Sequence, residues 1–514
     1  MFKKVLIANR GEIAVRIVRS CRLLGVSPVA VFSDADRLAL HVRLADEAYR
    51  LGPGPSSESY LRIDRLLAVA AACGAQAIHP GYGFLSENPD LARACEERGI
   101  AFVGPTPEAM LAMGDKLEAR RFATAAGVPV VPGTPDPVSS PEAAIAAAAG
   151  IGYPVLLKAA AGGGGKGMRL VEHPEEIGRA FRAATSESTA AFGRGEVYLE
   201  RFVSPSRHVE VQILGDGRGG IIHLGERACS IQRRHQKLVE ETPAPGISSE
   251  LRVKLHEAAC AITRAARYRG AGTVEFLVDR DERYYFLEMN TRLQVEHPVT
   301  EMVTGLDLVA AQLLIAATGE LPWAQSEIAA RGAAIELRIM AEDPDRQFMP
   351  APGTITWMRE PGGPGVRWDG GVYAGYTVPI YYDPLLGKLI TWGLDRFAAL
   401  ARMRAALDEL ELCGPPTTAG FLREVLESEE FRGGSYDTGF VERFLASRSR
   451  TAAPSESQSQ AERIAVIAAA LGYLERRRGP ETPRAAGKVV VAGNNGGQWA
   501  LVSRQMALRP GLRD

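Results

Sequence analysis

The first hundred residues alternate short apolar runs with stretches of helical periodicity, a pattern that few folds satisfy. Val5–Ala8 is the first apolar run, a stretch with helical spacing follows it, and Val29–Phe32 is the second run. Strand, helix and strand in this order predict a parallel sheet covered by helices. The pattern recurs through Ala75–His79 and Ile100–Val103. We therefore expect an N-terminal parallel α/β domain that ends near Met113.

Length and composition limit the classes of protein to consider. A chain of 514 residues exceeds one compact core and predicts roughly three domains of about 150 residues each. The net charge of −1 gives no electrostatic basis for binding nucleic acid or a membrane surface. The six cysteines include no Cys-x-x-Cys pair, which argues against a zinc site. The N-terminal apolar run is too short for a signal peptide or a membrane span, so we expect a cytoplasmic protein.

Later segments predict a mobile unit and further sheet elements. Val155–Lys158 and Arg169–Val171 are apolar runs joined by a glycine-rich turn, which is typical of a hairpin. A helix is expected before them, because Ser140 and Pro141 form a good N-cap and first turn. This small α/β unit is suited to act as a lid. Other predicted elements are an antiparallel hairpin and three further segments: Thr273–Val278 with Tyr284–Met289, strands at Ala333–Ile339 and Lys388–Trp392, and a helix at Arg396–Leu412.

The C-terminal segment has its own organisation. Residues 447–460 predict a linker, because Thr451–Gln460 is rich in Ser, Gln, Ala and Pro. Residues 461–514 form a C-terminal extension, with a helix expected over Ala461–Arg476 and short strand-like runs at Lys488–Ala492 and Trp499–Val502. Two interpretations stay open: the extension packs on its own catalytic domain, or it docks a partner protein through an apolar helix stripe.

The most informative chemical motif runs from Glu288 to Pro298. Alternate side chains of a strand share one face. If the chain stays extended, that face carries Glu288, Asn290, Arg292, Gln294 and Glu296. Glu275, on the preceding predicted strand, can lie beside Glu288. Two carboxylates with an amide oxygen suit Mg²⁺, a hard cation that bridges phosphates. The alternative interpretation is a solvated strand face.

Two other motifs are compatible with anion binding. Gly162–Gly165 and Gly167 lack side chains, so their backbone N–H groups can close around phosphate oxygens, with Lys158 and Lys166 nearby. A flexible hairpin tip is the alternative, and the pattern is not a Walker A motif. Arg233–Lys237 places four basic-type side chains within five positions. This run indicates either a solvated surface patch or an anion site.

Nine motifs, in order along residues 1–446, resemble those of the biotin carboxylases, members of the ATP-grasp superfamily. They are Ile7–Ile13, His79–Asn88, Met113–Lys116, Lys158 with the glycine loop, Gln232–Lys237, Gly270–Glu275, Glu288–Glu301, Ala341–Pro344 and Tyr373–Pro379. The resemblance implies an α/β fold in three domains. These are an N-terminal pre-ATP-grasp domain (1–113), an ATP-grasp domain (114–330) with a lid at about 131–203, and a C-terminal α+β domain (331–446).

The resemblance also implies an activity, that of an ATP-dependent ligase. ATP activates bicarbonate as carboxyphosphate, which carboxylates biotin on a separate biotin carboxyl carrier protein. This is the first half-reaction of an acetyl- or propionyl-CoA-type carboxylase, as in fatty acid biosynthesis. The alternatives are the equivalent subunit of a 2-oxo acid (pyruvate-type) carboxylase, another ATP-grasp ligase, or a non-catalytic scaffold subunit. The full set of acids, bases and phosphate ligands argues against the scaffold.

By similarity, the site residues divide into four groups. ATP is expected to contact Lys116, Lys158, Gly163, Gly164, Gly165, Glu200, Arg201, Val203, His208, Gln232, His235, Glu275, Leu277 and Glu288. Two Mg²⁺ or Mn²⁺ ions are expected on Glu275, Glu288 and Asn290. Bicarbonate is expected to bind Lys237, Arg292, Gln294 and the backbone of Val295. Glu296 resembles the base that deprotonates bicarbonate, and Arg338 resembles the group that stabilises the biotin enolate oxygen. The catalytic set is therefore Glu296, Arg338, Arg292 and Lys237.

The expected partners are proteins rather than nucleic acid or membrane. Multidomain carboxylases carry biotin in a Met-Lys-Met sequence, which does not occur in this chain, so the carrier and the carboxyltransferase are expected to be separate chains. A homodimer is expected from the resemblance, with contacts near Arg19 and Arg367. Leu23 and Pro364 differ from the charged and aromatic residues often found near those positions.

Overall fold

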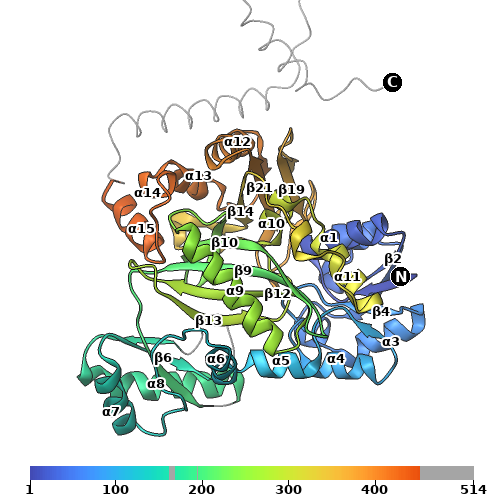
Figure 1. Ribbon diagram of the computed structural model, residues 1–514. Helices are drawn as coiled ribbons and strands as arrows, with labels where there is room; N and C mark the ends of the chain where they lie inside the picture. The colour runs from blue at the N-terminus through green and yellow to red at the C-terminus, as the bar shows by residue number, and fades with distance from the viewer. Residues whose placement is uncertain (161–167, 194, 452–514) are drawn as a thin grey trace, which may run out of the picture. The chain divides into compact units, whose positions relative to one another are not determined.

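The computed structural model describes residues 1–160, 168–193 and 195–451. By its contacts the chain forms two units, Met1–Ala446 and Ser447–Asp514, and the second is described only as far as Thr451. The glycine run and the predicted extension helix and strands therefore lie outside the described residues. Figure 1 shows the arrangement of the elements in the first unit.

The N-terminal part is a parallel α/β layer, as the alternating apolar runs predict. Its five-stranded parallel sheet has the order β3-β2-β1-β4-β5. The strands are β1 (Lys4–Ile7), β2 (Ser27–Ser33), β3 (Glu47–Gly52), β4 (Ala77–His79) and β5 (Ala101–Phe102). The helices are α1 (Gly11–Leu23), α2 (Leu40–Leu44), α3 (Ile63–Cys73), α4 (Pro89–Glu96) and α5 (Pro107–Gly114). The apolar strands are buried because helices pack on both faces.

A single antiparallel sheet of eight strands forms the centre of the molecule. Its order is β13-β12-β9-β10-β11-β14-β21-β19. The strands are β9 (Arg207–Asp216), β10 (Ile221–Arg233), β11 (Gln236–Thr242), β12 (Arg269–Val278), β13 (Tyr284–Asn290), β14 (Ala333–Met340), β19 (Val366–Gly370) and β21 (Leu385–Gly393). Since β11 pairs with β14, the sheet crosses the expected domain boundary near residue 330 without a break. The predicted hairpin and both predicted C-terminal strands are confirmed.

Helices cover this sheet and complete the main core. They are α6 (Lys116–Ala125), α9 (Ser249–Ala265), α10 (His297–Thr304), α11 (Leu308–Thr318), α12 (Arg396–Glu409), α13 (Ala419–Glu427), α14 (Glu429–Arg432) and α15 (Phe440–Thr451). The helix predicted over Arg396–Leu412 ends three residues early, because Glu411–Cys413 forms β22, which pairs with β18 (Trp357–Arg359). Small two-stranded sheets add β15 (Glu342–Asp343), β16 (Met349–Pro350), β17 (Gly353–Thr354) and β20 (Thr377–Val378).

The predicted lid is a separate small unit. Its sheet has the order β7-β6-β8, from β6 (Val155–Ala159), β7 (Arg169–Val171) and β8 (Val197–Arg201), and it packs on α7 (Pro141–Ile151) and α8 (Ile177–Phe192). The pairing of β6 with β7 confirms the predicted hairpin, and the Ser140 side chain caps α7. In Figure 1 this unit projects from the body beside α6.

The C-terminal segment begins within a helix. Helix α15 continues through Thr451, so the first residues of the predicted linker, 447–451, are helical. Its first turns carry Phe440 and Val441, which are buried in the main core.

Among the described helices none alone is long and apolar enough to cross a membrane; only α10 and α11 together reach that length, and they are bent by 92°.

Candidate active site

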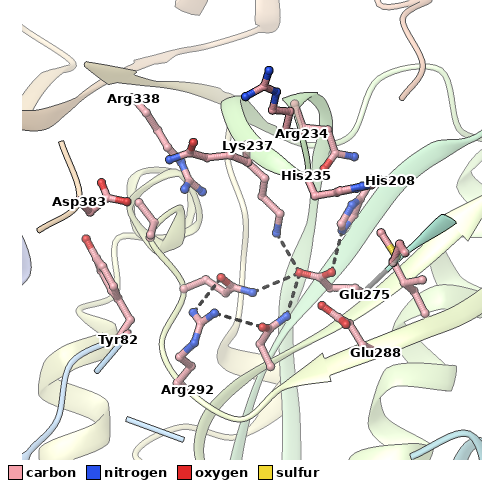
Figure 2. A pocket seen from close by; sticks show the side chains of 18 of the residues that line it. Tyr82, His208, Arg234, His235, Lys237, Glu275, Glu288, Arg292, Arg338 and Asp383 are labelled. Atoms are coloured by element: carbon pink, nitrogen blue, oxygen red, sulfur yellow. Dashed lines mark hydrogen bonds and ion pairs between the residues drawn. The ribbon is translucent and has the colours of Figure 1, made fainter. Parts of the chain in front are cut away.

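A cavity of about 960 Å³ lies where the N-terminal part, the lid and the large sheet meet. The N-terminal part contributes the loops that follow β1 and β4, at the carboxyl ends of parallel strands, where ligands of α/β sheets usually bind. The lid contributes residues of β6 and β8, and the large sheet contributes residues of β9 to β14 and of β21. Figure 2 shows the side chains that converge there.

The structure brings the predicted nucleotide residues together in this cavity. Its wall includes Lys116, Lys158, Glu200, Arg201, Val203, His208, Gln232, His235, Glu275, Leu277 and Glu288. Gly163, Gly164 and Gly165 lie outside the described residues. Burial lowers the pKa of Lys116, with Glu288 opposing and Lys158 adding to this effect. Lys158 is thus close enough to Lys116 to affect its charge, and a pair of neighbouring cations suits phosphate binding.

Glu275 and Glu288 face each other across neighbouring strands, as predicted. They are direct register partners on β12 and β13. Glu275 accepts hydrogen bonds from Lys237 Nζ at 2.9 Å and Asn290 Nδ2 at 2.9 Å, and it lies 3.1 Å from His208 Nε2 (Figure 2). Burial would raise the pKa of Glu275, but Lys237 and His208 hold it well below its usual value. Burial and the charge of Glu275 raise the pKa of Glu288.

This donor set fits the divalent cations implied by the family. Two carboxylates and an amide oxygen are hard ligands, and a cation between them would remove the repulsion that raises the pKa of Glu288. Among the described residues, no hydrogen bond or ion pair reaches the Glu288 carboxylate, so it is available as a ligand. Glu275, Glu288 and Asn290 are therefore the residues suited to hold Mg²⁺ beside bound phosphates.

Glu296 is fully buried and lies behind the cavity wall rather than in it. The condition of an extended chain from Glu288 to Glu296 is not met, because β13 ends at Asn290 and Glu296 is the N-cap of α10. Its carboxylate accepts from Lys237 Nζ at 2.6 Å and Arg338 Nη2 at 2.9 Å. Burial would raise the pKa of Glu296, but these two cations and Arg227 hold it well below its usual value.

Lys237 and Arg338 separate Glu296 from the cavity. The run Arg233–Lys237 forms the tight turn between β10 and β11, with Arg234 and His235 at positive φ. The solvated-patch interpretation is wrong for Lys237, which is only 9% exposed and donates to three carboxylates. Burial would lower the pKa of Lys237, but these carboxylates raise it well above its usual value.

Arg338 is shared between Glu296 and a carboxylate that the sequence did not single out, Glu240. Glu240 Oε1 accepts from Arg338 Nε at 2.6 Å, and both residues are buried. Burial raises the pKa of Glu240 to about 7, against the lowering effect of Arg338. Glu240 was missed because its role depends on β11 pairing with β14, a contact between segments about one hundred residues apart.

The remaining predicted residues line the same cavity with partners of their own. Arg292 donates to Glu87 at 2.9 Å and to Gln294 Oε1 at 3.1 Å. The backbone oxygen of Val295 accepts from Lys388 Nζ at 2.9 Å. Glu87 belongs to the His79–Asn88 motif, so that motif was the available signal for it, whereas the sequence offered no signal for the fully buried Lys388.

Comparison with known proteins gives the same picture over most of the chain. Family models match as "Biotin carboxylase, N-terminal domain" at residues 1–110, "Carbamoyl-phosphate synthase L chain, ATP binding domain" at 115–324 and "Biotin carboxylase C-terminal domain" at 336–443. Biotin carboxylase of a Nostoc species is 54% identical over 441 residues, 86% of this chain and 99% of the relative. A pyruvate carboxylase subunit of Methanothermobacter thermautotrophicus is 49% identical over 493 residues, 93% of this chain and 100% of the relative.

A solved structure resembles the described fold. It is the biotin carboxylase domain dimer of the Hydrogenobacter thermophilus 2-oxoglutarate carboxylase, in complex with MgADP, ADP and bicarbonate. Its TM-score is 0.84 at 46% identity, and the match covers 86% of this chain and 98% of that one.

A nucleotide-sized cavity between a small α/β lid and an antiparallel sheet, with lysines and paired carboxylates in its wall, defines an ATP-dependent ligase of the ATP-grasp class. Identity of about half over the whole catalytic part narrows this class. The chain belongs to the biotin carboxylase family. Its activity is the ATP-dependent carboxylation of biotin.

Proposed function

We propose that this chain carboxylates biotin held on a separate biotin carboxyl carrier protein, with Glu296 as the base and Arg338 as the group that stabilises the biotin enolate. The observation that carries the proposal is the burial of Glu296 between Lys237 and Arg338, directly behind the nucleotide cavity. This arrangement keeps the carboxylate ionised and beside two cations suited to anionic reactants.

Bicarbonate is proposed to bind where Lys237, Arg292, Gln294 and the Val295 backbone meet. An anion there competes with Glu296 and Glu275 for the Lys237 ammonium, and Glu296 then takes the bicarbonate proton. The deprotonated bicarbonate oxygen attacks the γ-phosphorus of ATP, which gives carboxyphosphate and ADP. Bound Mg²⁺ or Mn²⁺ on Glu275, Glu288 and Asn290 would supply neutralisation of the phosphate charge.

The second step transfers the carboxyl group to biotin. Carboxyphosphate breaks down to CO₂ and phosphate. The released phosphate takes the proton from the ureido nitrogen of biotin, whose oxygen gains negative charge, and the nitrogen then attacks the carbon of CO₂ to give carboxybiotin. The Arg338 guanidinium is a permanent cation suited to that oxygen, because burial does not deprotonate it beside Glu240 and Glu296. The lid is proposed to exclude water, which would otherwise hydrolyse carboxyphosphate.

For the holoenzyme we propose an acyl-CoA carboxylase of the acetyl- or propionyl-CoA type, with a homodimer of this chain and a separate carboxyltransferase subunit. The solved relative described above is a dimer, which supports the homodimer, and light scattering would test it. A cytoplasmic location stays our prediction; the six cysteines are all free thiols, as expected in a reducing compartment.

A 2-oxo acid carboxylase is the second candidate, and one observation favours it. The match to the Methanothermobacter pyruvate carboxylase subunit covers 93% of the 514 residues, so it extends past Ala446 into the C-terminal segment. Purification of the chain with its bound partners, followed by carboxylation assays with acetyl-CoA, propionyl-CoA and pyruvate, would decide between the two candidates.

Substitution of the two proposed catalytic residues tests the mechanism. Glu296→Gln and Arg338→Ala are expected to bind ATP normally and to lose biotin carboxylation by roughly 10²-fold or more, the usual scale for a lost base or charge stabiliser. Glu257→Gln, an exposed position on α9, is the matched control and should keep full activity. Near-normal carboxylation by Glu296→Gln would remove the base assignment.

A further inference from the structure

Glu200 is a buried carboxylate held by two cations at once. It lies on β8 in the lid and is 3% exposed. One of its oxygens accepts from Arg120 Nη1 and the other from Lys158 Nζ. Both cations are buried as well, so all three charges share one environment with little water. Two cations on one carboxylate exceed what charge balance there requires, and one of them is available for another anion.

Arg120 is fixed in its position, since it has other partners. It donates from Nη2 to the Val131 backbone oxygen at 2.8 Å, and its guanidinium lies 5.9 Å from the centre of the Tyr198 ring. Tyr198 packs in turn on Leu117, which is also on α6. The arginine therefore has three contacts, with Glu200, Val131 and Tyr198, that hold it in place.

Lys158 has a different position. It lies on β6, opposite Tyr198 in the strand register, and its ammonium reaches the neighbouring Glu200. Its side chain lines the nucleotide cavity, whereas that of Arg120 does not. Glu200 is its ion-pair partner among the described residues. A phosphate that binds Lys158 must therefore draw it from Glu200.

We propose that Arg120 is a positioning residue: it stays with Glu200 as a permanent counter-ion and so allows Lys158 to move to the nucleotide phosphates. Without Arg120, the departure of Lys158 would leave a buried carboxylate without a cation, which is strongly unfavourable. With Arg120 in place, Glu200 keeps a cation when Lys158 leaves, and Lys158 exchanges the Glu200 carboxylate for a nucleotide phosphate. The proposal rests on the proposed contact between Lys158 and ATP phosphates.

The test compares a ligand with phosphates and the same ligand without them. We expect Arg120→Met to weaken ADP binding by at least about tenfold while adenosine binding stays within the error of calorimetry, because only phosphates displace Lys158. Arg120→Lys, which keeps the charge, should recover most of the loss. Arg121→Met is the matched control; that residue is exposed, pairs with Glu118 and Asp136, and should change neither affinity.

Two further variants separate the possible failures. In a Glu200→Gln background, Arg120→Met should add no further loss to the ratio of ADP to adenosine affinity, because the buried carboxylate that Arg120 would have to neutralise is gone. Lys158→Met should remove the phosphate-dependent part of the affinity; if it does not, the proposed phosphate contact of Lys158 is wrong. If Lys158→Met has that effect but Arg120→Met lowers both affinities equally, or neither, then Arg120 has only a structural role and the counter-ion proposal is overturned.

Discussion

Individual buried charges in this molecule are shared rather than paired one to one. Lys237 donates to Glu210, Glu275 and Glu296, and Arg338 bridges two glutamates. Removal of one member of such a group leaves an uncompensated charge in a medium of low dielectric constant, which costs about 3–5 kcal/mol. Single substitutions around the site can therefore act on stability as well as on chemistry.

Lys388, which has no step in the proposed mechanism, provides a test of this cost. Its ammonium is fully buried, donates to the Val295 oxygen at 2.9 Å and lies 3.2 Å from Glu12. We expect Lys388→Met to lower the free energy of unfolding by about 3–5 kcal/mol, because Glu12 is left buried without its cation. Urea unfolding of the variant measures this change.

Two controls complete the Lys388 experiment. Lys254→Met removes an exposed lysine that pairs with Glu250 on the surface of α9, and it should change the free energy of unfolding by less than about 1 kcal/mol. The double variant Lys388→Met with Glu12→Gln should recover part of the loss. A Lys388→Met protein as stable as the unchanged chain would show that water reaches Glu12.

At the residue scale, the sequence predicted the side chains that face the cavity better than it predicted the buried side chains that hold them in position. Glu275, Glu288 and Asn290 follow strand alternation, so their common face was predictable. Glu210, Glu240 and Lys388 were not, because each depends on which distant strand or loop becomes its neighbour. The alternation of side chains along a strand did not predict the position of Glu296. Pro298, in the first turn of α10, favours a helix that begins directly after Glu296.

Among the elements, the lid differs most from the rest of the fold. It has its own three-stranded sheet and its own small apolar core, so it can move without disturbing the large sheet. We expect an ATP analogue with Mg²⁺ to slow protease cleavage within residues 130–205, because closure buries that segment. Cleavage rates in the loop 360–364, where Glu360 and residues 362–364 are exposed, are the internal control and should not change. Equal protection of the lid with and without nucleotide would contradict closure.

Helix α15 determines where the chain can be shortened. Phe440 and Val441 are part of the main core, so a chain that ends after Thr451 retains the whole helix and should fold. If residues 452–514 dock a partner, this truncation should leave carboxylation of free biotin nearly unchanged and abolish co-purification with the partner proteins. A chain that ends after Gly439 is the contrast; it loses Phe440 and Val441 and should unfold at lower temperature. Full assembly by the Thr451 truncation would favour the alternative of packing on the catalytic domain.

Element boundaries followed local signals where a cap or a turn fixed them. Ser140 with Pro141 placed the start of α7 correctly. The end of α12 was predicted too late, because the residues beyond it are as apolar as the helix and only their pairing with Trp357–Arg359 makes them a strand. The pairing of β11 with β14 had no local signal at all.

For the molecule as a whole, buried histidines are expected to lower the stability of the fold in acid. His41 and His79 are fully buried, and burial lowers the pKa of His41 from 6.5 to about 4 and that of His79 from 6.5 to about 3. Below pH 6.5 the unfolded chain takes up protons at these positions while the folded chain does not. Stability should therefore fall between pH 6.5 and about 4, by up to about 1.4 kcal/mol per pH unit for each histidine.

Unfolding midpoints at pH 7.5 and pH 5 measure this effect. His79→Gln should narrow the difference between the two midpoints, because glutamine does not titrate. His173→Gln, at an exposed position, is the matched control and should leave the difference unchanged. An unchanged difference in His79→Gln would assign the acid sensitivity to other groups.

The unbroken sheet from β13 to β19 limits how such proteins can be recombined. After a crossover near residue 330, β11 and β14 come from different parents, so the backbone N–H and C=O groups that pair these two strands must match across the junction. Exchange of the C-terminal part between relatives thus transplants three of the eight strands, β14, β21 and β19, and the strand edges must match. The lid has a complete sheet of its own, so chimeras made at its two connections should fold more readily than those made between α11 and β14.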